Sequence, residues 1–82
     1  MSQVVVIDYG MGNLKSVHRG LKKVGADVLI SSDPKEIATA ERLLLPGVGS
    51  FEGGMNGLAD AGVIPAINDF VNTGRPLMGI CL

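Results

Sequence analysis

The sequence predicts an α/β domain built on a parallel β-sheet with helices on both of its faces. Short apolar runs alternate along the 82 residues with stretches whose apolar residues recur at helical spacing. Glycine and proline mark the boundaries between these stretches. The apolar runs are continuous rather than alternating, as expected for strands that are covered on both faces.

The first strand is predicted over residues 4–7, because Val-Val-Val-Ile is a continuous β-branched run. The glycine-containing segment 8–13 follows it and permits a tight turn. A helix is predicted next, with Gly25 placed to end it. The apolar residues at helical spacing in this helix are Leu14, Val17, Leu21 and Val24.

A second strand is predicted over residues 28–30, which are again apolar. Asp33 then stands directly before Pro34. Aspartate is a preferred N-cap, and proline is favoured at the first helical position, so the pair predicts the start of a helix. We expect this short helix to run to about residue 40.

The second half of the chain begins with a third strand over residues 43–45, which a Pro-Gly pair ends. Helical stretches are predicted over residues 51–61 and 64–71. A turn at 74–76 leads to a fourth strand over 77–80, which we expect inside the sheet. The residues expected on one side of the second helical stretch are Ile64, Ile67, Phe70 and Val71.

The last six residues, 77–82, are apolar to the end apart from one glycine. A strand of this kind needs neighbours, since an exposed apolar edge invites aggregation. We therefore expect residues 1–82 to be the N-terminal part of one larger domain.

Composition excludes several classes of function. Seven basic and eight acidic residues give a net charge of -1, which offers no electrostatic case for nucleic acid or an anionic membrane. No apolar run reaches the length of a membrane span, and the first residues lack the basic region of a signal peptide. A single cysteine fits a reducing compartment, so we expect a cytoplasmic protein.

Chemistry is expected beyond the carboxyl ends of the strands, where open α/β sheets gather their ligands. Cys81 directly follows the fourth strand. A nucleophile at such a strand-to-helix turn projects from the sheet, and a helix N-terminus favours its thiolate. The alternative is a buried structural cysteine, a common fate of this residue.

A second candidate is the loop that contains Gly47, Val48 and Gly49, at the end of the third strand. Its glycines allow positive φ, so its amides can turn towards an anion or a tetrahedral oxygen. An ordinary strand-to-helix connection is the alternative interpretation.

The turn after the first strand is not a dinucleotide-binding motif. Gly10 and Gly12 are followed by Lys15 where the third glycine is required, so we expect only a tight turn with Asn13 opening the first helix. His18, the only histidine, falls within that helix and is not expected to act as a catalytic base. Without a cysteine and histidine cluster, no zinc site is expected.

Two of these segments resemble the motifs of the class I glutamine amidotransferases. Gly79-Ile80-Cys81-Leu82 is similar to the start of the nucleophile motif G-[IV]-C-L-G, and Leu45-Pro46-Gly47-Val48-Gly49 to the oxyanion loop. The resemblance implies a flavodoxin-like parallel sheet, incomplete here, with about four strands of the larger domain. It also implies hydrolysis of glutamine to glutamate and ammonia, without a cofactor or a metal. Cys81 would be the nucleophile, and the oxyanion would be held by the amide of Leu82 and one from Val48 or Gly49, in the loop that starts at Gly47.

The opening segment 8–17 narrows the resemblance to the glutaminase subunits of imidazole glycerol phosphate synthases. Such a subunit passes ammonia to a cyclase partner, a (β/α)8 barrel of histidine biosynthesis that makes imidazole glycerol phosphate and AICAR. Gly10, Met11 and Asn13 would face that partner. The catalytic His and Glu of the family lie far downstream of the nucleophile, so we do not expect residues 1–82 alone to hydrolyse glutamine.

Two alternatives remain open from the sequence. The glutaminase could serve another synthase, such as those that make anthranilate, aminodeoxychorismate, GMP or pyridoxal phosphate. The chain could also be a non-catalytic flavodoxin-like binding module in which Cys81 is only buried.

Overall fold

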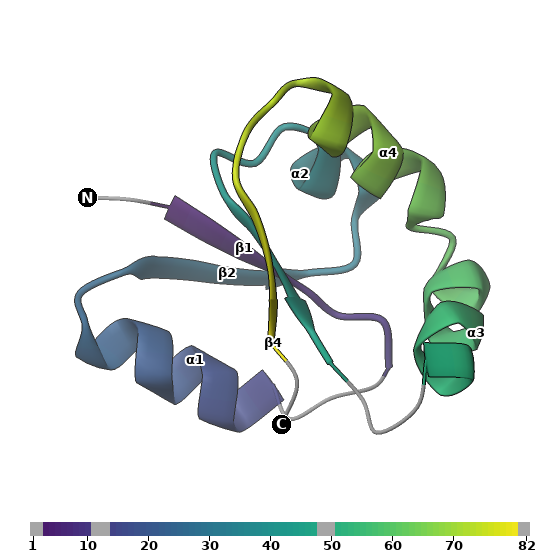
Figure 1. The fold of residues 1–82 in the computed structure, drawn as a ribbon. Helices are drawn as coiled ribbons and strands as arrows, with labels where there is room; N and C mark the ends of the chain where they lie inside the picture. Colours follow the sequence, from purple (N-terminus) through teal and green to yellow (C-terminus); the bar gives the residue numbers. More distant parts are fainter. Residues whose placement is uncertain (1–2, 11–13, 48–50, 81–82) are drawn as a thin grey trace.

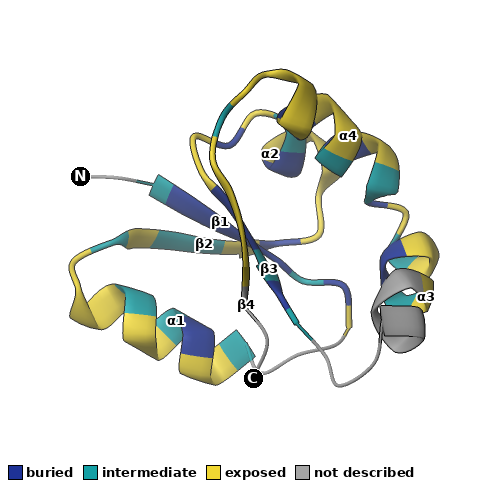
Figure 2. Cartoon of the chain, viewed as in Figure 1, coloured by how far each residue is buried: buried dark blue, intermediate teal, exposed yellow. Residues whose placement is uncertain are grey.

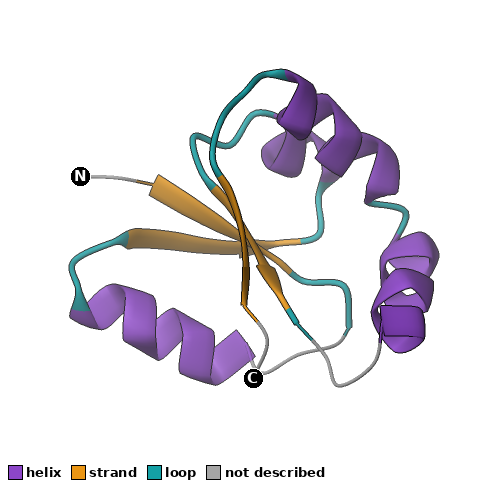
Figure 3. Ribbon diagram, in the orientation of Figure 1, coloured by secondary structure: helices purple, strands orange, loops and turns teal. Residues whose placement is uncertain are grey.

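A computed structural model describes residues 3–10, 14–47 and 51–80 of the chain. Strands and helices alternate as the sequence predicts (Figures 1 and 3). In the described part of the chain, no helix is both long and apolar enough to cross a membrane. The elements in order are β1 (Gln3–Ile7), α1 (Leu14–Lys23), β2 (Asp27–Ser31), α2 (Pro34–Ala38), β3 (Leu43–Pro46), α3 (Phe51–Ala61), α4 (Ile64–Asn72) and β4 (Leu77–Ile80).

The strands form one four-stranded sheet in the order β2-β1-β3-β4. All three neighbouring pairs are parallel, which confirms the predicted α/β class. The two central strands, β1 and β3, are the ones whose apolar runs are almost fully buried. All four strands therefore present their carboxyl ends at one edge of the sheet.

Helices cover both faces of the sheet, as Figure 2 shows with the burial of each element. Successive side chains of β1 point to opposite faces. Val4 and Val6 pack with Val17 of α1 on one face. Val5 and Ile7 pack on the other face within a larger cluster to which α2, α3 and α4 contribute.

The helix cap and the turn predicted from Asp33 and Gly25 are both present in the structure. The side chain of Asp33 accepts a hydrogen bond from the backbone N–H of Lys35 at 2.9 Å, and Pro34 is the first residue of α2. Gly25 follows α1 with φ +84°, a conformation that side-chain-bearing residues rarely adopt. Both predictions made from these residues are confirmed.

Two residues expected on buried helical faces are exposed. Val24 is 80% exposed, because α1 ends at Lys23 and Val24 lies in the turn that follows. Val71 is 49% exposed, because the buried positions of this region are Val63, Ala66 and Phe70. That spacing defines a stripe from which Val71 is displaced by about 100°, the rotation per residue of a helix.

Strand β4 lies at an edge of the described sheet, which agrees with the expectation that its apolar run needs a further neighbour. Leu77 is 43% exposed and Met78 is 60% exposed. Among the described residues, β4 has only β3 as a hydrogen-bonded neighbour, which accounts for the exposure.

Arg75 holds the amino end of β4 against helix α2. Its guanidinium lies over the ring of Phe70, 5.4 Å from the centroid. Its Nη1 donates to the carbonyl oxygens of Thr39 at 3.1 Å and Ala40 at 2.7 Å, and Nη2 donates to that of Ala38 at 3.1 Å. These carbonyls lie at the C-terminal end of α2, where backbone acceptors have no partner within the helix.

We expect Arg75→Lys to lower the free energy of unfolding by about 1–2 kcal/mol, because a lysine ammonium cannot donate to all three carbonyls as the planar guanidinium does. The effect is limited to this size because Arg75 is only partly buried. Urea denaturation followed by circular dichroism measures the change. Arg42→Lys is the matched control, since among the described residues the Arg42 side chain is seen in an exposed pair with Glu41 at 3.6 Å. An equal effect in both variants would contradict the conclusion that the hydrogen bonds of Arg75 hold β4 against α2.

Candidate active site

The register of β3 and β4 determines which residues meet at the carboxyl edge of the sheet. Leu45 pairs with Gly79, and Pro46 pairs with Ile80. The residues that follow in the sequence are Gly47 and Cys81. The loop after β3 and the segment after β4 therefore leave neighbouring strands at the same level, about 4.8 Å apart.

Of the residues predicted for this site, Gly47 is described and is partly buried. The predicted nucleophile and the other oxyanion-loop residues lie outside the described residues; these are Cys81, Leu82, Val48 and Gly49. Their roles remain predictions, and the described strands supply the backbone frame from which they follow.

Tyr9 is a residue of this edge to which the sequence analysis gave no role. Its side chain is 6% exposed, and its hydroxyl donates a hydrogen bond to the carbonyl oxygen of Pro46. The two residues are 37 positions apart in the chain. The sequence shows only that a tyrosine follows a buried strand. That pattern does not reveal that its hydroxyl donates to Pro46, which is 37 positions away.

Of the segment 8–13, predicted as a tight turn, the structure describes Asp8, Tyr9 and Gly10; Gly12 and the predicted helix-opening Asn13 lie outside the described residues. Gly10 has φ +82°, and its N–H donates to Oδ1 of Asp8 at 3.2 Å. The N–H of Asp8 in turn donates to the carbonyl of Ser31 at 2.9 Å, which joins the ends of β1 and β2. Gly10 is exposed, and its role facing a partner stays a prediction. Met11 and Asn13, the other predicted partner-facing residues, lie outside the described residues.

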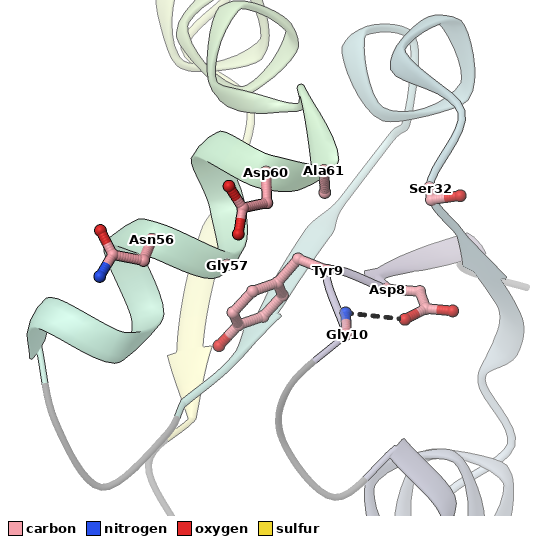
Figure 4. Close-up of a pocket in the computed structure, with 8 residues that line it drawn as sticks. All are labelled: Asp8, Tyr9, Gly10, Ser32, Asn56, Gly57, Asp60 and Ala61. Carbon is pink, nitrogen blue, oxygen red and sulfur yellow. Dashed lines mark hydrogen bonds between the residues drawn. The ribbon is translucent and has the colours of Figure 1, made fainter.

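An open pocket of about 690 Å³ lies beside Tyr9. Figure 4 shows the ring of Tyr9 between the end of β1 and helix α3, with the Asp60 carboxylate on the α3 side. The pocket adjoins the carboxyl edge of the sheet, where open α/β sheets bind their ligands. Its lining residues are Asp8, Tyr9, Gly10, Ser32, Asn56, Gly57, Asp60 and Ala61.

His18 lies elsewhere, as expected. It is partly buried and lines a separate groove of about 410 Å³ with Leu14, Lys15, Arg19, Lys22 and Ile30. Among the described residues, that groove shares none with the pocket beside Tyr9.

Burial raises the pKa of the Tyr9 hydroxyl above its ordinary value of 10.0. A raised folded-state pKa means that the folded chain holds this proton more tightly than the unfolded chain. The resulting contribution to stability is complete below pH 10.0 and is lost as the pH rises through the higher folded-state pKa.

We therefore expect the midpoint of tyrosinate formation to lie above 10.0 in the folded 82-residue chain and to return to about that value in urea. Tyr9 is the only tyrosine and there is no tryptophan, so ultraviolet absorbance reports on this hydroxyl alone. The difference in alkaline stability between the wild type and Tyr9→Phe isolates the contribution of Tyr9. A midpoint that is equal with and without urea would contradict the burial of the hydroxyl.

Comparison with known proteins places this arrangement in a family context. Residues 5–82 match the family described as glutamine amidotransferase class-I. The chain is 44% identical over 82 residues to a protein of Geobacter sulfurreducens named imidazole glycerol phosphate synthase subunit HisH. It is 48% identical to the HisH subunit of Symbiobacterium thermophilum and 50% identical to HisH 1 of Legionella pneumophila strain Paris, again over 82 residues. In each case the match covers the whole of this chain but only 39%, 39% and 38% of those relatives, respectively.

Proposed function

The chain belongs to the class I glutamine amidotransferase family, and from this membership we propose that it forms the nucleophile-bearing part of a glutaminase. The proposed substrate is glutamine, and the proposed products are glutamate and ammonia. In this proposal Cys81 is the nucleophile, and the loop that begins at Gly47 supplies amides to the oxyanion. Residues 1–82 are proposed to be the N-terminal part of one amidotransferase domain.

The pairing of Pro46 with Ile80 is the observation that carries the proposal. Oxyanion stabilisation requires donors within about 3 Å of the oxygen that gains charge. The proposed nucleophile, Cys81, comes one residue after Ile80, and the glycine loop begins one residue after Pro46. The two segments therefore leave adjacent strands at the same level. This frame supports attack at Cys81 with the oxyanion held between the two segments.

The proposed reaction has two steps. The Sγ thiolate of Cys81 attacks the side-chain amide carbon of glutamine, and the collapse of the tetrahedral intermediate breaks the C–N bond and releases ammonia. Water then attacks the γ-glutamyl thioester, which frees glutamate and regenerates the thiol. Each step forms an oxyanion, and one donor to it lowers the barrier by about 3–4 kcal/mol.

A general acid and base are also required, to protonate the leaving ammonia and to activate the water. His18 does not suit this role, because it lines the separate groove on α1. We propose that the complete protein supplies a His and a Glu from residues downstream of the nucleophile, as in the family.

The names of the relatives favour one partner among the alternatives. They describe subunits of imidazole glycerol phosphate synthase. We propose that the complete protein forms a heterodimer with the (β/α)8-barrel cyclase of that enzyme and passes ammonia to it in histidine biosynthesis. The turn at Gly10 is proposed to face this partner together with Met11 and Asn13.

The proposal is tested with a complete polypeptide in which residues 1–82 are followed by the matching C-terminal part of the Geobacter sulfurreducens relative. Glutamate formation is measured with and without the cyclase of that organism. We expect turnover by the complete polypeptide, stimulated by the cyclase, and none by residues 1–82 alone. Turnover by the 82-residue chain, or its absence from a folded complete polypeptide with the cyclase, would refute the proposal. Stimulation by an anthranilate synthase component instead would identify another partner.

A further inference from the structure

The hydrogen bond from Tyr9 to Pro46 lies where the main-chain pairing of β1 with β3 has ended. The described pairs between these strands are Val5 with Leu43 and Val6 with Leu44. Beyond Leu44 a side chain takes over, because the Tyr9 hydroxyl donates to the last carbonyl of β3. Tyr9 and Pro46 are both buried, so water does not compete readily for this bond.

This bond fixes the start of the loop that follows β3. The peptide unit between Pro46 and Gly47 is planar, so the direction of the carbonyl oxygen also determines the direction of the Gly47 N–H. The proline ring fixes φ of Pro46 as well. The loop therefore begins from a peptide plane that Tyr9 holds on one side and the strand pairing with Ile80 holds on the other.

We propose that Tyr9 is a positioning residue for glutamine hydrolysis, which holds the Pro46 carbonyl so that the following loop presents its amides to the oxyanion. This inference rests on the proposed function. Tyr9 does not contact the reacting atoms in this account. It acts through the Pro46–Gly47 peptide, and it joins the turn at Gly10 to the loop after β3.

The proposal makes a specific kinetic prediction. Amides aimed at an oxyanion stabilise the transition state more than bound glutamine. Loss of their alignment therefore lowers kcat and leaves KM nearly unchanged. A residue that served only packing would lower stability without this effect on the folded enzyme.

The test uses Tyr9→Phe in the complete polypeptide with its cyclase, assayed where circular dichroism shows the protein folded. We expect kcat to fall about tenfold, the effect of one hydrogen bond, with KM within about twofold. Tyr9→Met is a second variant that fills the site without a hydroxyl, and it should reproduce the loss.

Thr39→Val is the matched control, because it also removes a hydroxyl that donates to a backbone carbonyl, that of Lys35 at 2.7 Å. It lies on the α2–β3 connection, at the amino end of β3, and should leave kcat unchanged. Wild-type kcat in folded Tyr9→Phe, or equal kcat losses in Tyr9→Phe and Thr39→Val, overturns the positioning role alone. A wild-type enzyme without glutaminase activity overturns the proposed function as well.

Discussion

Replacing Cys81 with alanine is expected to abolish glutamine hydrolysis by the complete polypeptide and to leave its fold intact. Loss of the nucleophile removes the thioester route, and in hydrolases such a loss lowers kcat by roughly 10⁴- to 10⁶-fold. The measurement is glutamate formation in the presence of the cyclase. Ammonia-dependent synthesis by the cyclase should be unaffected, because that reaction bypasses the glutaminase.

Thr39→Val again provides the control, since in the described part of the chain its hydroxyl makes a local bond to Lys35 at the C-terminal end of α2. It should retain glutaminase activity while Cys81→Ala loses it. Activity within about tenfold of wild type in Cys81→Ala would mean that the thiol is not the nucleophile, and the buried structural cysteine would become the better interpretation.

The largest expected effect on stability is that of Phe70→Ala. Phe70 is 0% exposed, lies in the larger core cluster and carries the Arg75 guanidinium over its ring. Phenylalanine-to-alanine substitutions in cores cost about 3–5 kcal/mol. A chain of 82 residues has a total stability of only about 4–12 kcal/mol. We therefore expect Phe70→Ala to lose a large share of the free energy of unfolding, measured as a lowered midpoint of thermal denaturation followed by circular dichroism.

The neighbouring Val71→Ala is the matched control for this substitution. Val71 is 49% exposed, so its truncation removes little buried area and should cost less than about 1 kcal/mol. A larger loss from Val71→Ala than from Phe70→Ala would mean that Val71, and not Phe70, faces the core.

Local chemistry explains why most of the fold could be predicted from the sequence. The Asp33-Pro34 pair opens α2 and Gly25 closes the α1 turn, because their preferred conformations are set by the residues themselves. Continuous β-branched runs predicted the parallel sheet in the same way, since such runs require cover on both faces.

The errors arise where burial depends on tertiary neighbours. Phe70 and Val71 were both predicted on the buried side of α4, but only Phe70 is buried. Periodicity alone cannot decide which of two adjacent apolar residues faces the core.

The sequence predicted which strand ends form the candidate site. It did not predict hydrogen bonds between residues far apart in the chain. Cys81 and the loop at Gly47 could be named because their motifs are local, and the pairing of Pro46 with Ile80 supports their proximity. The bonds of Tyr9 to Pro46 and of Arg75 to the end of α2 join residues 35–37 positions apart. Only the folded arrangement brings such donors and acceptors together.

The most direct test of the central claim is to trap the covalent intermediate. The complete polypeptide is mixed with isotopically labelled glutamine and the cyclase, quenched in acid during turnover, digested and mapped by mass spectrometry. We predict a γ-glutamyl adduct on the peptide that contains Cys81, which hydroxylamine removes. Steady glutamate production with an unmodified Cys81 peptide, or an adduct on a different residue, would contradict the account.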